Sequence, residues 1–198
     1  MEHDHNGATH PTGRLIIARH GETQWSRLGK HTGRTDVPLT HGGNEAALAL
    51  GARLREFAPT AVYTSPLIRA RDTALRAGFP SPIIDDRLAE WDYGSYEGVT
   101  SAEIHTTVPG WSIWTGDVPE GESHSEVALH ADAFITEVLE REPHGTTLAF
   151  THGHIGRMIA ARWLGLEPIA GRLFAFDTAH FGVLGFERAQ RAMHCWNV

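Results

Sequence analysis

Short apolar runs recur along the chain and stop abruptly at polar residues. Residues 15–18 are all apolar and are followed at once by Arg19, which is typical of a buried strand whose end feeds a loop. Residues 61–64 and 146–151 repeat this pattern, and residues 83–84 form a shorter run. These four segments predict the strands of one sheet.

Between these runs, apolar residues recur at helical spacing and helix-capping residues mark the starts. The pair Ser65-Pro66 is typical of a cap followed by proline in the first turn. Thr100 and Ser123 each lie three residues before a glutamate, which is the spacing of a capping box. Together these signals predict helices over 43–57, from 65 to about 77, near 100, from 123 to about 141 and over 155–164.

The alternation of strands and helices predicts an α/β fold, a three-layer α/β/α sandwich around a mostly parallel mixed sheet. Residues 25–40 are rich in glycine, threonine and charge and predict a long loop. Residues 172–198 predict three short strands with a turn near His180. We expect one domain over 14–198 and a disordered polar tail over 1–13.

Composition narrows the class of protein. The 198 residues carry a formal net charge of −7 with neutral histidine, which argues against general binding of nucleic acid or anionic membranes. No apolar run approaches the ~20 residues of a membrane-spanning helix, and no secretion signal is recognisable. The lone cysteine, Cys195, cannot form an internal disulfide and is expected to be a buried apolar residue. These features predict a cytoplasmic protein.

Two of the predicted strands end at a histidine, His20 and His152. Ligands of open α/β sheets gather at the carboxyl ends of strands, so both are candidate site residues. Arg19 and Arg69 offer planar guanidinium groups that suit phosphate oxygens, and Gly21 lets backbone approach an anion. A neutral His20, with one nitrogen bonded to a carbonyl, would be a nucleophile toward phosphorus.

Other interpretations of these residues stay open on local sequence alone. His20, His152 and His154 would suit a transition-metal site, but no nearby Asp, Glu or Cys completes a recognisable ligand spacing, so we expect no metal. Arg69 by itself is typical of a solvated helix residue. Glu90 has apolar and aromatic neighbours that would keep it protonated, ready to donate to a leaving oxygen, or it is a surface carboxylate in a turn.

Four segments together resemble one family. Residues 19–23 have the sequence RHGET, which resembles the signature of the histidine phosphatase (phosphoglycerate mutase-like) superfamily. Residues 64–74, TSPLIRARDTA, resemble its T-S-P-L-x-R-A-x-x-T-A segment, and residues 151–153, THG, match its second histidine motif. Glu90 falls at the position of the family's acid. The order and spacing agree from about residue 14 to residue 198, so the resemblance implies a phosphoglycerate mutase-like fold.

The resemblance implies a phosphatase that needs neither a metal nor a cofactor. His20 would attack phosphorus and become phosphohistidine, while Glu90 would protonate the leaving alkoxide and then deprotonate the attacking water. Arg19, Arg69 and His152 would stabilise the phosphoryl oxygens. The residues expected to bind phosphate are Arg19, Gly21, Thr23, Ser26, Thr32, Gly33, Arg69, Glu90, Tyr93, His152 and Gly153.

Two departures from the family pattern indicate which subgroup of the family this sequence resembles. Ser26 stands where the family usually has Asn, and Thr32 stands where it often has Gln. Both positions usually touch the phosphoryl group, and the shorter hydroxyls can still donate a hydrogen bond. With residues 90–98 and 121–123, they resemble a subgroup that includes sedoheptulose-1,7-bisphosphatase and small bacterial acid phosphatases often labelled phosphoglycerate mutases.

The favoured function is hydrolysis of small phosphorylated metabolites, ahead of a phosphoglycerate mutase and of an inactive binding or scaffold protein. A mutase must exclude water from its phosphohistidine, and residues 97–126 are shorter than the insertion that covers the pocket in cofactor-dependent mutases. The inactive alternative would require loss of His20, Glu90 or an essential arginine, and all are present.

Substrate recognition is predicted only in outline. Lys30, Arg27 and Arg34 would either meet a second phosphate or belong to a solvated loop. Trp111 and Trp114 are expected to pack a cap over the site. Dimers are common in the family, so a homodimer is a further expectation of the resemblance.

Overall fold

The computed structural model describes residues 11–198, and within them six strands form one mixed sheet. The strands are β1 (Arg14–Arg19), β2 (Ala61–Thr64), β3 (Ile83–Ile84), β4 (Thr146–Thr151), β5 (Phe181–Glu187) and β6 (Gln190–Cys195). Their order in the sheet is β3-β2-β4-β1-β5-β6. The first three pairings are parallel and the last two are antiparallel, which confirms the predicted mostly parallel mixed sheet.

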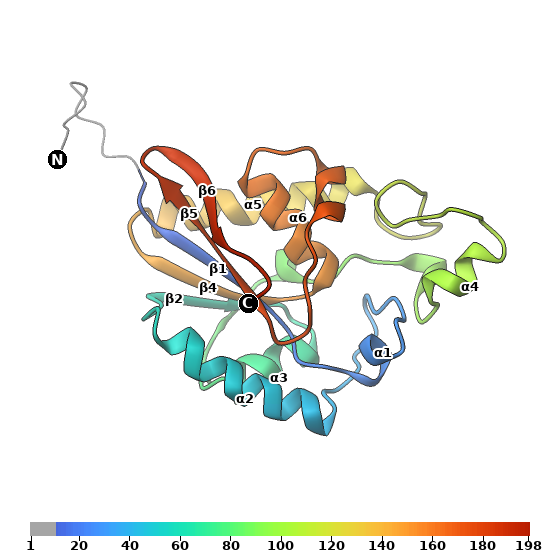
Figure 1. Ribbon diagram of the computed structural model, residues 1–198, viewed down its shortest axis with the longest axis horizontal. Helices are drawn as coiled ribbons and strands as arrows, with labels where there is room; N and C mark the ends of the chain where they lie inside the picture. Colours follow the sequence, from blue (N-terminus) through green and yellow to red (C-terminus); the bar gives the residue numbers. More distant parts are fainter. Residues whose placement is uncertain (1–10) are drawn as a thin grey trace.

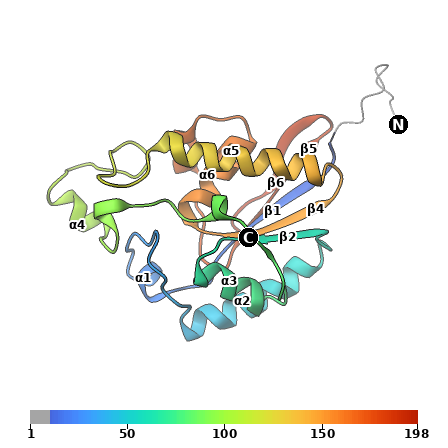
Figure 2. The same ribbon diagram turned by 180° about the vertical axis from the view of Figure 1, so that it is seen from behind.

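Helices cover both faces of this sheet, so the predicted three-layer sandwich is confirmed. Figures 1 and 2 show α2 (His41–Arg55) and α3 (Ile68–Arg76) on one face, with α5 (His124–Arg141) and α6 (Gly153–Trp163) on the other. Two short helices, α1 (Gln24–Arg27) and α4 (Ser101–His105), lie together at one end of the molecule in both views. Single 3-10 turns occur at Asp86–Leu88, Gly94–Tyr96 and Pro168–Leu173.

The central strand β1 shows why a continuous apolar run is needed. Leu15 and Ile17 belong to the core cluster on the α5–α6 face, whereas Ile16 and Ala18 belong to the cluster on the α2–α3 face. Alternate side chains of a strand point to opposite faces, and here both faces are covered, so all four positions are fully buried.

The strand register brings the candidate residues to one edge. Arg19 pairs with Thr151 between β1 and β4, so His20 and His152 leave neighbouring parallel strands at the same level. The backbone N–H of His20 donates to the carbonyl of Thr151 over 2.9 Å, which extends the pairing beyond the strands. The sequence motifs therefore meet at the carboxyl edge of the sheet, as predicted.

Capping predictions have mixed outcomes. The capping boxes at Thr100 and Ser123 are both present, at the starts of α4 and α5. The prediction that Ser65 caps a helix is wrong, because α3 begins at Ile68, whose N–H donates to Asp36 Oδ1 over 2.8 Å. Ser65 Oγ accepts from Leu67 N–H over 3.2 Å, before the helix begins, and lies 2.7 Å from His152 Nε2. Its hydroxyl thus joins the turn before α3 to a partner that is distant in sequence.

The third strand predicted in 172–198 is also wrong. Residues 174–180 form no strand because their backbone groups bond to the end of β1: Ala179 N–H donates to His20 O over 3.0 Å, and Phe176 O accepts from Arg19. The turn predicted near His180 is present. Within the predicted loop 25–40, the first residues complete α1.

The remaining outcomes concern the ends of the chain. The predicted tail lies outside the described residues up to residue 10, but Thr12 and Gly13 are held, because both backbone N–H groups donate to Pro143 O over 2.9 Å. Cys195 is only half-buried, against the edge of the α2–α3 core.

Across residues 11–198, none of the helices combines the length and the apolar character that spanning a membrane requires.

Candidate active site

His20 is the first residue after β1 and is buried at the floor of a cavity. Its Nδ1 lies 2.7 Å from Gly21 O, and because a carbonyl only accepts, Nδ1 carries the proton and Nε2 keeps a free lone pair. Burial lowers the pKa of His20 well below its usual range, and the positive charges of Arg69 and Arg19 lower it further. The imidazole is therefore neutral, as a nucleophile requires.

Gly21 is held tightly beside it. Its N–H donates to Thr73 Oγ1 over 2.9 Å, and that hydroxyl in turn donates to Arg69 O over 2.7 Å. A Cβ on Gly21 would come within 2.5 Å of Gly43 O, so close approach to α2 excludes a side chain. The loop after β1 is thus fixed by α2 and α3 together.

His152 and Arg69 form a fully buried pair directly behind His20. Arg69 Nε donates to His152 Nδ1 over 3.0 Å, so the Nε2 of His152 carries the proton and donates to Ser65 Oγ. Burial lowers the pKa of His152 well below its usual range, with further contributions from Arg69, His20 and Arg19. The rings of His20 and His152 are 5.2 Å apart between centroids.

Arg69 also holds the loop that follows α1. Its Nη1 donates to Thr35 O over 3.0 Å, and its Nη2 donates to Thr32 O and Gly33 O over 2.8 and 2.9 Å. Glu97 accepts from the N–H groups of the same loop, Gly33 and Thr35. Most donors of Arg69 are therefore committed to protein acceptors.

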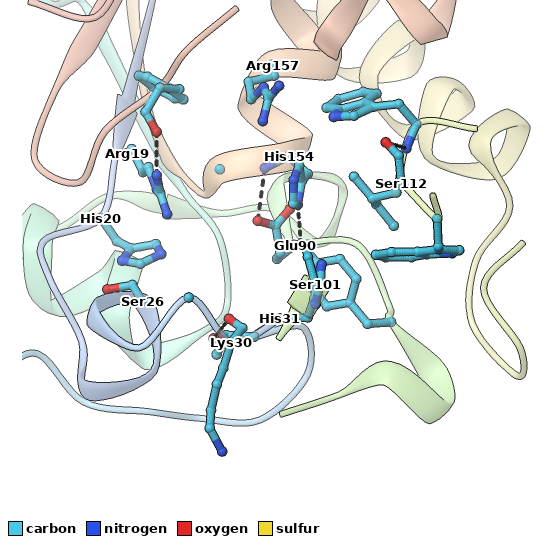
Figure 3. A pocket seen from close by; sticks show the side chains of 18 of the residues that line it. Arg19, His20, Ser26, Lys30, His31, Glu90, Ser101, Ser112, His154 and Arg157 are labelled. Atoms are coloured by element: carbon cyan, nitrogen blue, oxygen red, sulfur yellow. Dashed lines mark hydrogen bonds between the residues drawn. The ribbon is translucent and has the colours of Figure 1, made fainter. Parts of the chain in front are cut away.

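Arg19 differs from Arg69, because one of its buried N–H donors has no protein acceptor. Nη1 is bonded to Phe176 O, whereas the buried Nε has no protein partner. Burial lowers the pKa of Arg19, and Glu90, Tyr93 and Asp177 act in the opposite direction. An unpaired buried donor is costly unless a ligand satisfies it, and Figure 3 shows this guanidinium directed into the cavity.

Glu90 is held by backbone at the start of α6. Its Oε1 accepts from Trp91 N–H over 3.1 Å and Ile155 N–H over 2.9 Å, and its Oε2 accepts from His154 N–H over 3.0 Å. Three backbone N–H groups thus hold the Glu90 carboxyl group at the start of α6, and the side chain is buried, so the alternative of a surface carboxylate in a turn is wrong.

Glu122 ties the Glu90 segment to the loop held by Arg69. Its carboxylate accepts from Asp92 N–H over 2.7 Å and lies 3.6 Å from Arg34 Nη2, while its carbonyl accepts from the Trp91 indole over 2.8 Å. Sequence reasoning noted residues 121–123 only as part of a resemblance and missed this role. Trp91 itself is buried.

These elements enclose a cavity of about 410 Å³ (Figure 3). Seven predicted site residues line it, and five lie outside its lining. Those that line it are Arg19, His20, Ser26, Thr32, Glu90, Tyr93 and Gly153; those outside are Gly21, Thr23, Gly33, Arg69 and His152. Arg69 and His152 thus act on His20 from behind.

A sequence profile of the family described as the histidine phosphatase superfamily (branch 1) matches residues 15–198. The chain belongs to the histidine phosphatase superfamily. This histidine phosphatase is 42% identical over 182 residues to an acid phosphatase of Mycobacterium tuberculosis, covering 91% of this chain and 90% of that protein. It is 34% identical over 186 residues to sedoheptulose 1,7-bisphosphatase of Saccharomyces cerevisiae, covering 78% and 69%.

Solved structures agree with the sequence relationship. The structure of the open reading frame Rv3214 from Mycobacterium tuberculosis matches with a TM-score of 0.91 at 40% identity, covering 94% of this chain and 97% of that chain. The predicted family, fold and phosphatase class are therefore confirmed.

The two departures, Ser26 and Thr32, face the cavity but direct their hydrogens elsewhere. Ser26 Oγ donates to Thr23 O over 3.0 Å inside the capping box of α1, and Thr32 Oγ1 donates to Lys30 O over 3.1 Å. Neither hydroxyl therefore offers a donor to a bound anion in this arrangement.

The metal alternative finds no support in the geometry. Both nitrogens of His152 are engaged, and the Nδ1 of His20 is bonded to a carbonyl. Throughout residues 11–198, no group of three or more His, Cys, Asp or Glu side chains is arranged to hold a metal ion.

Several cavity residues were missed or only partly anticipated from sequence. Trp111, Trp114 and Lys30 line the cavity, as the predicted cap and second-phosphate site would require, whereas Arg34 is paired with Asp92 and Glu122. The lining residues that sequence reasoning did not assign to substrate are Gly29, His31, Ser101, His105, Ser112, Ile113, His154, Arg157 and Phe176. Of these residues, only His154, two residues after His152, was singled out from the sequence, as a possible metal ligand.

Proposed function

We propose that this histidine phosphatase hydrolyses small phosphomonoesters through a phosphohistidine on His20. The observation that carries the proposal is the neutral imidazole with a free Nε2 at the cavity floor, its Nδ1 fixed by Gly21 O. Beside it, the unpartnered buried Nε of Arg19 offers a charged donor to a phosphoryl oxygen.

In the first step the Nε2 lone pair of His20 attacks phosphorus, and the bond from phosphorus to the leaving oxygen breaks. A monoester that enters as the monoanion brings a proton, because its second pKa is about 6. Glu90 takes up this proton and passes it to the departing oxygen. The products are the alcohol and phosphohistidine.

In the second step water attacks the phosphoryl group on His20 and the N–P bond breaks. Glu90 accepts a proton from that water, which restores the neutral imidazole and releases inorganic phosphate. Arg19 contacts the phosphoryl oxygens in both transition states, while the buried charge of Arg69 keeps His20 unprotonated.

The cavity suits a small phosphorylated metabolite. Its volume of about 410 Å³ is within the usual range of small-molecule sites. Arg157 also lines it and in Figure 3 lies above His154, which favours a substrate with a second acidic group, such as a bisphosphate or a phosphorylated acid. We place this reaction in the cytoplasm, because charged phosphate esters are retained inside cells.

The test compares wild type with His20→Asn, which keeps an N–H donor toward Gly21 O. Release of phosphate from p-nitrophenyl phosphate should fall by roughly 10³-fold or more, and acid-quenched wild type should carry acid-labile phosphate that the variant lacks. His41→Asn, on the exposed start of α2, is the matched control. Full activity of His20→Asn would disprove the nucleophile. With 3-phosphoglycerate plus 2,3-bisphosphoglycerate, 2-phosphoglycerate in place of inorganic phosphate would indicate a mutase.

A further inference from the structure

Of the three cavity histidines that the proposed chemistry does not use, His31 and His154 lie close to each other and His105 is the third. The rings of His31 and His154 are stacked, with centroids 6.2 Å apart and planes 17° from parallel. Tyr93 meets both rings edge-on, at 4.9 Å from His31 and 5.8 Å from His154. Both imidazoles therefore belong to one aromatic cluster on the cavity wall.

The hydrogen bonds of this cluster fix a different tautomer on each ring. His31 Nδ1 lies 2.7 Å from Val99 O, so Nδ1 carries the proton and Nε2 is an acceptor. His154 Nδ1 lies 2.5 Å from the Tyr93 hydroxyl, which has no other partner among the described residues. The phenol therefore donates to His154 Nδ1, and the Nε2 of His154 carries its own proton as a donor.

Both rings are neutral and rigid. Burial lowers the pKa of His31 and lowers that of His154 well below its usual range, where Arg157 adds to the effect. Trp111 packs edge-on against His31 and Trp114 against His154, with centroids 5.3 and 5.5 Å apart. Neither Nε2 has a protein partner among the described residues, so an acceptor and a donor stand preorganised for a ligand.

This pair lies on the leaving-group side of the proposed reaction. The backbone N–H of His154 donates to Glu90, the proposed donor to the leaving oxygen, and the charge of Glu90 acts on the pKa of His31. In Figure 3 both histidines are drawn next to Glu90, away from Arg19 and His20. A group attached close to the leaving oxygen would reach the two rings.

We propose that His31 and His154 form a subsite for a hydroxyl group on the leaving alcohol, and that they select polyhydroxylated phosphate esters over plain alkyl phosphates. A hydroxyl donates one hydrogen bond and accepts others, so it satisfies the acceptor on His31 and the donor on His154 together. An anion offers no hydrogen to His31, and an alkyl chain leaves both nitrogens unpaired. This inference rests on the proposed phosphatase function.

The experiment measures kcat/KM for glycerol 3-phosphate and for propyl phosphate, which differ by two hydroxyls. Taking the ratio of the two values within each protein cancels any loss of folded enzyme. Wild type should prefer glycerol 3-phosphate by roughly 10-fold or more, and His31→Phe and His154→Phe should each lower the ratio about 5- to 10-fold. The control His41→Phe, on an exposed side chain, should keep the wild-type ratio.

The outcomes separate this subsite from the phosphatase proposal. The subsite is refuted if the ratio of the two kcat/KM values stays within twofold of wild type in both His31→Phe and His154→Phe. It is also refuted if wild type hydrolyses p-nitrophenyl phosphate but neither glycerol 3-phosphate nor propyl phosphate. Loss of preference in the two variants with the preference kept in His41→Phe supports it. Wild-type activity that survives His20→Asn would instead refute the phosphohistidine mechanism.

Discussion

Acidification should unfold this protein through its buried histidines before its carboxylates are protonated. The pKa values of His20, His152 and His154 are all lowered well below the ordinary 6.5. In the unfolded chain each regains its ordinary pKa and binds a proton that the folded state does not. Stability is therefore complete above about pH 6.5 and is lost as the pH falls toward the lowered folded pKa values.

The magnitude follows from proton linkage. Each histidine that is protonated only in the unfolded chain contributes about 1.4 kcal/mol per pH unit to the slope of stability against pH. The three buried imidazoles then give up to ~4 kcal/mol per pH unit once the pH is well below 6.5, a large part of the 5–15 kcal/mol total typical of a folded domain. His31, which is also buried, adds in the same direction.

The assay is urea unfolding at several pH values between 7.5 and 5, followed by fluorescence. His20→Asn should reduce the slope of unfolding free energy by about 1.4 kcal/mol per pH unit, because one titrating site is gone. His41→Asn, whose side chain is exposed, should leave the slope unchanged. Between pH 6 and 5, the unfolding free energy of wild type should fall by more than the uptake of one proton accounts for, which is about 1.4 kcal/mol per pH unit. A smaller change would refute the claim that the buried imidazoles are neutral, and with it the proposed nucleophile.

Three further changes test the site and its support. Glu90→Gln should slow alkyl phosphates at least ~10²-fold more than p-nitrophenyl phosphate, because a good leaving group needs little protonation, and equal losses would contradict its role as acid. Thr73→Val leaves the buried N–H of Gly21 without its acceptor and should cost about 1–3 kcal/mol in urea unfolding; an unchanged midpoint would show that the contact is unimportant. Gly51→Ala would place a Cβ 2.2 Å from Ala77 O and should therefore lower Tm. Alanine in place of glycine normally raises Tm in an open helix, so a rise would refute this close contact between α2 and the end of α3.

Local signals in the sequence were enough for most of the elements. The bounds of β2 and β4 were predicted to the residue, since a strand buried on both faces needs every position apolar or small. The capping boxes at Thr100 and Ser123 were equally readable, because donor and acceptor lie three residues apart. The proposed nucleophile, His20, and its neighbour Arg19 were named from the contiguous motif that begins at Arg19.

Local sequence did not show contacts whose partners come from distant parts of the chain. Ser65 has the sequence of a helix cap, yet its hydroxyl meets His152, 87 residues away. Glu90 has apolar neighbours in sequence, yet the N–H groups of His154 and Ile155 surround its carboxylate.

The sequence by itself determined the layers of the fold and the phosphatase family, because the patterns and motifs that indicate them lie in contiguous stretches of the chain. Only the tertiary structure decided which groups line the cavity with a donor or acceptor unpaired. It bonded Arg69 to His152, left Arg19 Nε without a protein partner, and brought His31 beside His154 across more than half of the chain. The physical reason is that a side chain's free donors are those left over after folding, and folding assigns partners by distance in space.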